Sequence, residues 1–196
     1  MKKVLLLWLF SSSLLFSQIL DYDYEITPLV GYNISEANQN LPNQTLTGAE
    51  FQLDNIGMPV NYEFSILHTS TDFHPNYGST NITRIAQSGV YYYKKRSRFT
   101  PFVKMGLGYE TMSRQYRAYT GDRDSVFFDA STGTKIALVK HISLKLEILY
   151  MQKLNAYRYD NNIAFLAGLN FAFGDARSIE LRKDENKQIT IDEDSK

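Results

Sequence analysis

The sequence predicts an all-β chain that closes into an eight-stranded antiparallel up-and-down transmembrane β-barrel. Eight strand-like stretches fall between about residues 24 and 173, and the connectors between them are alternately long and short. Within most stretches apolar and polar residues alternate with a period of two, which places them on opposite faces of a sheet. Alternating connector length is typical of membrane barrels, which keep tight turns at one rim and longer loops at the other.

The N-terminal residues have the pattern of a secretory signal. Lys2 and Lys3 supply positive charge, and residues 4–10 and 14–16 form an apolar core that three serines interrupt. This core is shorter than the roughly 20 apolar residues of a spanning helix. We therefore expect residues 1–17 to be a signal peptide, with a cut after Ser17, and residues 18–174 to form the barrel. An uncleaved anchor is the alternative.

The composition agrees with a small barrel and excludes several function classes. The 196 residues include 14 Tyr and 12 Phe at a mean hydropathy of −0.32, as expected when each strand is half apolar and aromatic rings gather at the rims. There is no Cys, so disulfide and thiolate chemistry and a lipoprotein signal are excluded. Without Lys2 and Lys3 the chain keeps 19 basic against 21 acidic residues, and we expect no nucleic-acid partner.

The first four strands differ in how clearly they alternate. The first, near residues 24–33, and the second, near 48–53, alternate imperfectly. The third sets an apolar face against a polar one: Val60, Tyr62, Phe64 and Ile66 against Asn61, Glu63 and Ser65. The fourth, near residues 83–93, carries an awkward residue on either face, Arg84 or Gln87. We expect a β-bulge there.

The last four strands alternate more regularly. The fifth sets Pro101, Val103, Met105, Leu107 and Tyr109 against Phe102, Lys104, Gly106, Gly108 and Glu110. The sixth sets Phe128, Ala130, Thr132, Thr134 and Ile136 against Asp129, Ser131, Gly133 and Lys135. The seventh sets Ile142, Leu144, Leu146, Ile148 and Tyr150 against Ser143, Lys145 and Glu147. The eighth sets Phe165, Ala167, Leu169, Phe171 and Phe173 against Ala164, Leu166, Gly168, Asn170 and Ala172.

The connectors predict the topology. The long links are expected near residues 35–47, 68–81, 112–124 and 152–161, and the short links near 54–58, 94–98 and 139–141. An even number of strands leaves both chain ends on the side of the short turns. In an outer-membrane barrel that side is the periplasm.

The polar faces predict a charged interior. Eight strands leave a bore that only side chains fill, so opposite charges there should pair. The predicted ion-pair network of the lumen comprises Glu25, Glu50, Glu63, Lys104, Glu110, Asp129, Lys135, Lys145 and Glu147. Five glycines share this face and would relieve crowding: Gly31, Gly106, Gly108, Gly133 and Gly168. We expect an occluded lumen rather than an open pore.

Aromatic residues gather at both predicted rims. Tyr91, Tyr92 and Tyr93 lie beside a basic turn, and Phe171 and Phe173 end the last strand on the same side, as in an interfacial girdle. A second group lies in the long loops: Arg114, Tyr116, Arg117, Tyr119, Tyr157, Arg158 and Tyr159. Tyrosine with arginine is typical of recognition surfaces. An outer girdle that touches lipid headgroups is the equal alternative.

Residues for catalysis or metal binding are few. His68 and His74 are expected to share the second long loop, where two solvated histidines are favoured over a metal or general-base pair. No nucleophile, base and acid have a spacing that supports a catalytic set. We expect no cofactor, no metal and no enzymatic activity.

Three segments resemble a known family. Residues 100–109 (TPFVKMGLGY), 143–150 (SLKLEILY) and 167–174 (AGLNFAFG) are similar to the fifth, seventh and eighth strands of the small outer-membrane barrel superfamily, which includes the OmpA membrane domain, OmpX and the opacity-type proteins. The resemblance implies export to the bacterial outer membrane, with its lipid and the barrel assembly machinery as partners. The chain departs from many such barrels in its tail, residues 175–196, with 7 acidic and 5 basic residues, which we expect to be a disordered periplasmic segment.

The family includes adhesins, structural tethers and proteins of unknown role, so the resemblance is specific for fold and weak for function. We expect a structural or surface-binding, adhesin-like role, in which the extracellular loops contact a host or surface ligand and charged side chains plug the lumen. The alternative is a narrow channel for ions or small solutes.

Overall fold

The computed structural model describes residues 22–35, 41–53, 60–73, 78–93, 98–114, 123–154 and 161–174. The predicted signal peptide, residues 1–17, and the predicted tail, residues 175–196, lie outside these residues, as does part of every connector except the β6–β7 turn. No helix in the described part of the chain is long and apolar enough to cross a membrane.

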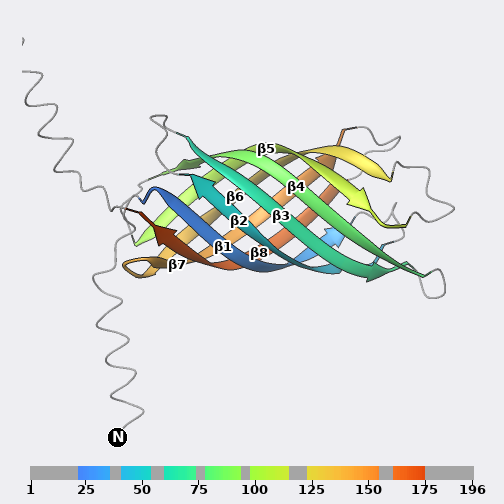
Figure 1. Cartoon of the computed structure of the whole chain (residues 1–196), viewed down its shortest axis with the longest axis horizontal. Helices are drawn as coiled ribbons and strands as arrows, with labels where there is room; N and C mark the ends of the chain where they lie inside the picture. The colour runs from blue at the N-terminus through green and yellow to red at the C-terminus, as the bar shows by residue number, and fades with distance from the viewer. Residues whose placement is uncertain are drawn as a thin grey trace, which may run out of the picture.

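Eight strands form one closed antiparallel barrel, as predicted (Figure 1). In chain order they are β1 (Tyr24–Ser35), β2 (Gln44–Leu53), β3 (Asn61–Asp72), β4 (Ser79–Tyr92), β5 (Phe99–Met112), β6 (Asp124–Val139), β7 (Ile142–Lys153) and β8 (Asn161–Phe173). Each strand pairs with its neighbours in sequence, and β1 pairs with β8 to close the ring. Closure leaves no strand edge exposed.

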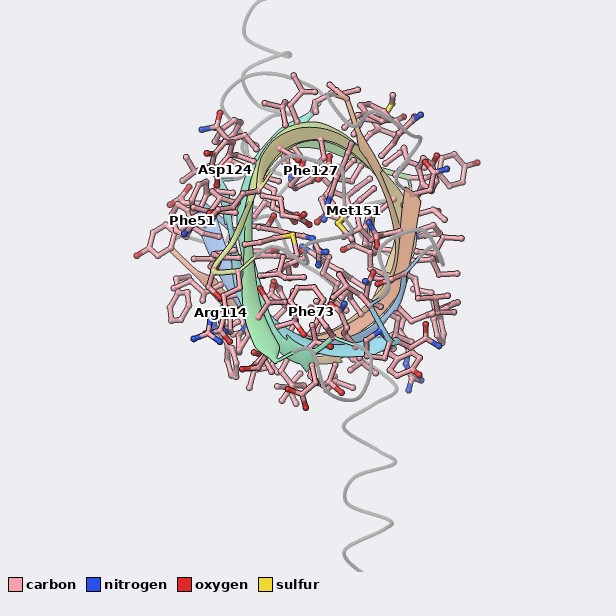
Figure 2. The ribbon with its side chains drawn as sticks, turned by 90° about the vertical axis from the view of Figure 1, so that its right-hand side faces the viewer. Phe51, Phe73, Arg114, Asp124, Phe127 and Met151 are labelled. Carbon is pink, nitrogen blue, oxygen red and sulfur yellow. The ribbon has the colours of Figure 1, made fainter. Side chains whose placement is uncertain are left out.

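The register of the ladder fixes the width of the barrel. A path across the paired residues starts at Tyr24 of β1, passes through every strand, and returns to β1 at Ile34, ten residues further along. For eight strands this offset corresponds to a strand tilt of about 40° and to an interior that side chains alone can fill. Figure 2 looks along the barrel axis: Phe127 and Met151 point into the ring, whereas Phe51 points away from it.

The predicted faces of the third, fifth, sixth, seventh and eighth strands match the structure. On β5, for example, Val103, Met105 and Leu107 are exposed on the outside, whereas Phe102 and Lys104 are buried inside. Because the side-chain period is two, a register error of one residue would exchange the two faces of a strand. The regular alternation of burial along every strand shows that the apolar outside and the polar inside belong to one consistent register.

The strands extend further towards the long loops than the sequence predicts. β3 continues to Asp72, and β4 begins at Ser79. The expectation that His68 lies in a loop is therefore wrong: His68 is on the outer face of β3, and its Nδ1 lies 3.1 Å from Thr83 Oγ1. Beyond the apolar belt the outward positions become polar, so the alternation continues without the hydrophobic signal that identified the strand. His74 lies outside the described residues.

The expected bulge in the fourth strand is also wrong. β4 pairs without interruption with β3 and with β5. Arg84 and Gln87 occupy opposite faces of a regular strand, because Arg84 finds a carboxylate partner inside while Gln87 points outward. The register irregularity lies instead between Ala137 and Val139, beside the tight β6–β7 turn.

The five predicted glycines lie on the inner face, where a Cβ atom would collide with a neighbouring side chain. At Gly133 a Cβ atom would lie 2.6 Å from the ring of Phe102, and at Gly108 it would lie 2.6 Å or less from the ring of Phe127. Gly48, on the same face of β2, is equally confined against Leu67. Glycine at these positions makes space for large residues on the neighbouring strands.

Replacing an inner glycine should destabilise the barrel. We expect Gly133→Val to lower the free energy of unfolding by about 1–3 kcal/mol, because the added methyl groups overpack the space that Phe102 occupies. Urea unfolding in lipid vesicles measures the change. Thr134→Val, at the adjacent outward position of β6, is the matched control and should be close to neutral. Equal effects of the two variants would contradict the assignment of faces.

Candidate functional site

The barrel lumen holds a dense set of charged side chains. All nine residues of the predicted network are buried there, none with more than 4% of its surface exposed: Glu25, Glu50, Glu63, Lys104, Glu110, Asp129, Lys135, Lys145 and Glu147. They come from six of the eight strands, β1, β2, β3, β5, β6 and β7, and all except Asp129 belong to one of three groups along the barrel axis.

The central group joins three carboxylates to two lysines. Lys104 Nζ lies 3.2 Å from Glu50, 2.9 Å from Glu63 and 2.6 Å from Glu147. Lys145 Nζ lies 2.6, 2.8 and 3.2 Å from the second oxygens of the same three carboxylates. Each carboxylate therefore gives one oxygen to each lysine. This arrangement satisfies the buried charges from both sides and crosslinks β2, β3, β5 and β7 across the bore.

The group nearest the short turns is built around Lys135. Its ammonium pairs with Glu25 and lies 4.6 Å from the centroid of the Tyr92 ring, within the range of a cation–π contact. The Tyr92 hydroxyl donates a hydrogen bond of 2.5 Å to Gln52 Oε1. The four residues link β1, β2, β4 and β6, so this end of the lumen is closed by a polar network with an aromatic member.

The group nearest the long loops contains two residues that the sequence reasoning missed. Arg84 Nε lies 2.6 Å from Glu110, and Lys153 Nζ lies 2.6 Å from the other oxygen of the same carboxylate. Arg84 was missed because its strand was ambiguous, and Lys153 because β7 was expected to end sooner. Continuing the alternation of β7 beyond Met151 would have placed Lys153 inside.

Asp129 stands apart from these groups and accepts a hydrogen bond from Ser88 Oγ at 3.2 Å.

An apolar layer separates the central group from the loop-side group. The inner face of β7 reads, from the turn end to the loop end, Lys145, Glu147, Leu149, Met151 and Lys153, so two buried apolar residues lie between the central group and the loop-side group. The layer continues around the bore as one cluster: Leu29, Leu46, Leu67, Ala86, Phe127, Leu149, Met151, Ala164 and Leu166. A second cluster lies nearer the loops: Leu41, Phe73, Ile82 and Met112.

The charge balance of the lumen is nearly neutral. Among the described inner residues, the six acids are Glu25, Glu50, Glu63, Glu110, Asp129 and Glu147, and the five bases are Arg84, Lys104, Lys135, Lys145 and Lys153. In a space that water hardly enters, an unpaired ion costs several kcal/mol, so near-neutrality is expected of a structural network. The described residues contain no group of three or more His, Asp or Glu side chains that could hold a metal ion.

Of the predicted recognition group in the loops, the structure describes one residue, Arg114. Arg114 is exposed just beyond β5, and its backbone is fixed by two hydrogen bonds with Thr80 Oγ1, of 2.9 Å from the hydroxyl to the Arg114 carbonyl and 3.2 Å from the Arg114 N–H. The other members lie outside the described residues: Tyr116, Arg117, Tyr119, Tyr157, Arg158 and Tyr159.

Comparison with known proteins places the fold. No protein-family model matches the chain, and a search of curated proteins finds no match. Solved structures do match. Neisserial surface protein A (NspA) aligns with a TM-score of 0.61 at 12% identity, over 77% of this chain and 97% of its own. OprG of Pseudomonas aeruginosa aligns with a TM-score of 0.54 at 13% identity, over 80% and 98%. The outer membrane enzyme PagL aligns with a TM-score of 0.50 at 13% identity, over 76% and 99%. At these identities the likeness establishes the fold and not the activity.

Removing one cation from the central group should destabilise the barrel strongly. We expect Lys104→Met to lower the free energy of unfolding by about 3–5 kcal/mol, because three buried carboxylates would then share Lys145 alone. Urea unfolding in lipid vesicles measures this. Lys140→Met, at the exposed β6–β7 turn, is the control and should change little.

A second variant separates charge from packing. Combining Lys104→Met with Glu147→Gln restores the original charge difference of the central group, and it should recover part of the lost stability. If the double variant is as unstable as the sum of its single changes, the network does not stabilise the barrel through its charges.

Proposed function

We propose, on the premise that this chain has the fold of the small eight-stranded outer-membrane β-barrels, that it is an integral outer-membrane protein with a plugged lumen. It acts as a structural or surface-binding, adhesin-like barrel, and its extracellular loops make the contacts. Export by the N-terminal signal, folding by the barrel assembly machinery and periplasmic chain ends belong to the same proposal.

The outer surface supports the placement in a membrane. On β5 the outward positions from Phe99 to Tyr109 are apolar or aromatic. Ten strand residues at a tilt of about 40° span about 25 Å along the barrel axis, which is the height of the apolar band of outer-membrane barrels. Aromatic rings mark the turn-side rim, where Tyr24 and Phe173 stack with centroids 5.8 Å apart. Such rings are typical of the lipid–water boundary.

The filling of the lumen is the observation that carries the functional proposal. A permeating ion would have to displace the carboxylates from Lys104 and Lys145, and then cross the apolar layer that contains Leu149 and Met151. The first step breaks paired buried charges and the second brings the ion among mainly apolar side chains, and each is unfavourable. These features support a plug, and they leave the loops as the part of the molecule that contacts partners.

The base of the third long loop supports a binding role. Arg114 is held at its backbone by Thr80 while its side chain remains exposed. The strands thus present the loop from a rigid scaffold, and an ordered scaffold lowers the entropic cost of binding. The tyrosines and arginines that follow in the sequence have the composition of recognition surfaces. The surface or host ligand is the proposed partner.

A plugged lumen predicts that the protein conducts no ions in electrical recordings. We expect the purified, folded barrel to show no steady single-channel openings in planar bilayers, because paired charges and a mainly apolar layer fill the lumen. Phe127→Ser combined with Met151→Ser, which opens that layer, is the comparison and should allow small currents. Steady, large openings of the unaltered protein would favour the narrow-channel alternative and overturn the plug.

A surface-binding role predicts dependence on the loops. We expect shortening of the third loop within residues 115–122 and of the fourth within residues 155–160 to reduce adhesion of bacteria to host cells several-fold. Shortening the first loop within residues 36–40 is the control, because that segment has neither Tyr nor Arg. If adhesion is unchanged while a strain without the protein loses permeability to small solutes, the binding role is wrong.

A further inference from the structure

One amide side chain lies in the middle of the apolar outer belt. Gln87 of β4 is exposed on the outside of the barrel. Its ladder partners are Phe64 on β3 and Leu107 on β5, and both are exposed apolar residues. The Gln87 amide makes no hydrogen bond to any other described residue. It offers donors and an acceptor to an environment that, in a membrane, supplies neither.

The amide is too deep in the belt to reach water. On β4, Gln87 lies four positions from Tyr91, near the turn-side rim, and four positions from Thr83, where the outward positions become polar. Four residues at a tilt of about 40° correspond to a depth of about 10 Å. A glutamine side chain extends roughly 5 Å from its backbone. Unlike lysine or arginine near a rim, Gln87 cannot satisfy its amide in the headgroup region.

The surface around Gln87 has a ridge. Gly89 is the next outward residue of β4, and the Val60 side chain lies over it: a Cβ atom added at Gly89 would lie 2.9 Å from Val60 Cγ1. On β5, Met105 and Leu107 protrude, with 62% and 57% of their surfaces exposed. Figure 1 shows β3, β4 and β5 side by side in the wall. A polar group that forms a hydrogen bond across the contact is typical of association within membranes.

We propose that the β3–β5 wall binds a second copy of this chain, with the Gln87 amides of the two copies hydrogen-bonded to each other. The inference goes beyond the plugged barrel and rests on its placement in the membrane. All copies insert with the same orientation, so the two-fold axis of a dimer runs along the membrane normal. Such an axis places Gln87 of both copies at the same depth. An amide is both donor and acceptor, so it is complementary to itself.

The same axis brings the ridges of the two copies into contact. A two-fold axis between β4 and β5 sets β4 of one copy against β5 of the other, and the reverse contact occurs symmetrically. Met105 and Leu107 of each copy then pack against β4 of its partner copy, while the two Gln87 side chains converge at the axis. The contact therefore buries the most protruding part of the belt and satisfies the polar group that the single barrel leaves unpaired.

The absence of cysteine in the native sequence makes crosslinking a clean test. Met105→Cys places one thiol in the proposed interface, and Val30→Cys, on the far side of the barrel on β1 with 53% exposure, is the matched control. Membranes containing either variant are treated with a short bismaleimide, and dimers are separated on a denaturing gel. We expect dimers from Met105→Cys well above the level from Val30→Cys. Adding Gln87→Leu to Met105→Cys should reduce them at least about threefold.

The controls distinguish the possible failures. The shift in mobility of unheated samples reports whether each variant is a folded barrel, and Gln87→Leu should fold because it makes the outer belt more apolar. Equal crosslinking of the two cysteine variants, or no effect of Gln87→Leu in folded barrels, overturns the dimer. Crosslinking of Met105→Cys to a different protein also overturns it. If the chain is absent from the membrane fraction, the placement in the membrane fails, and the dimer fails with it.

Discussion

The pairing of β1 with β8 is the constraint on which the rest of the structure depends. In hydrocarbon an unpaired backbone N–H or C=O costs several kcal/mol, so a sheet is stable there only if its edges meet. Closing eight strands with an offset of ten residues sets the tilt, and the tilt sets a bore that side chains must fill. The inner glycines, the ion pairs and the apolar belt all follow from that narrow ring.

The lumen resolves a conflict between two requirements. Outward positions must be apolar. Where apolar and polar residues alternate strictly along a strand, the inner positions then carry polar residues. A bore without bulk water makes single charges costly, so they occur as shared groups such as Glu50 and Glu63 bridged by Lys104 and Lys145. Where the inner positions are apolar, as at Leu149 and Met151, the chain packs a conventional core. The lumen thus holds paired charges in some layers and a packed apolar core in another.

The predictability of each feature followed the strength of its local signal. Strands with clear alternation, such as β3, β5 and β7, could be assigned to faces from the sequence, because parity alone decides the face. Which charges meet could not be predicted, since Lys104 reaches Glu147 only through the offset accumulated around the ring. Arg84 and Lys153 were missed for a different reason: the apolar outer belt supplies the contrast that makes alternation visible, and both residues lie where that contrast weakens.

Gln87 shows the same requirement for a polar partner on the outer face of the barrel wall. Inside the barrel, polar groups are tolerated because the ladder brings partners to them, as Glu110 comes to Arg84. Outside, the ladder partners of Gln87 are Phe64 and Leu107, which cannot do so, and its amide stays unpaired in the single barrel. A residue that breaks the outer pattern therefore carries information that the regular positions do not. The lumen explains how a single barrel holds itself together, whereas the exception on its outer face indicates what the barrel associates with.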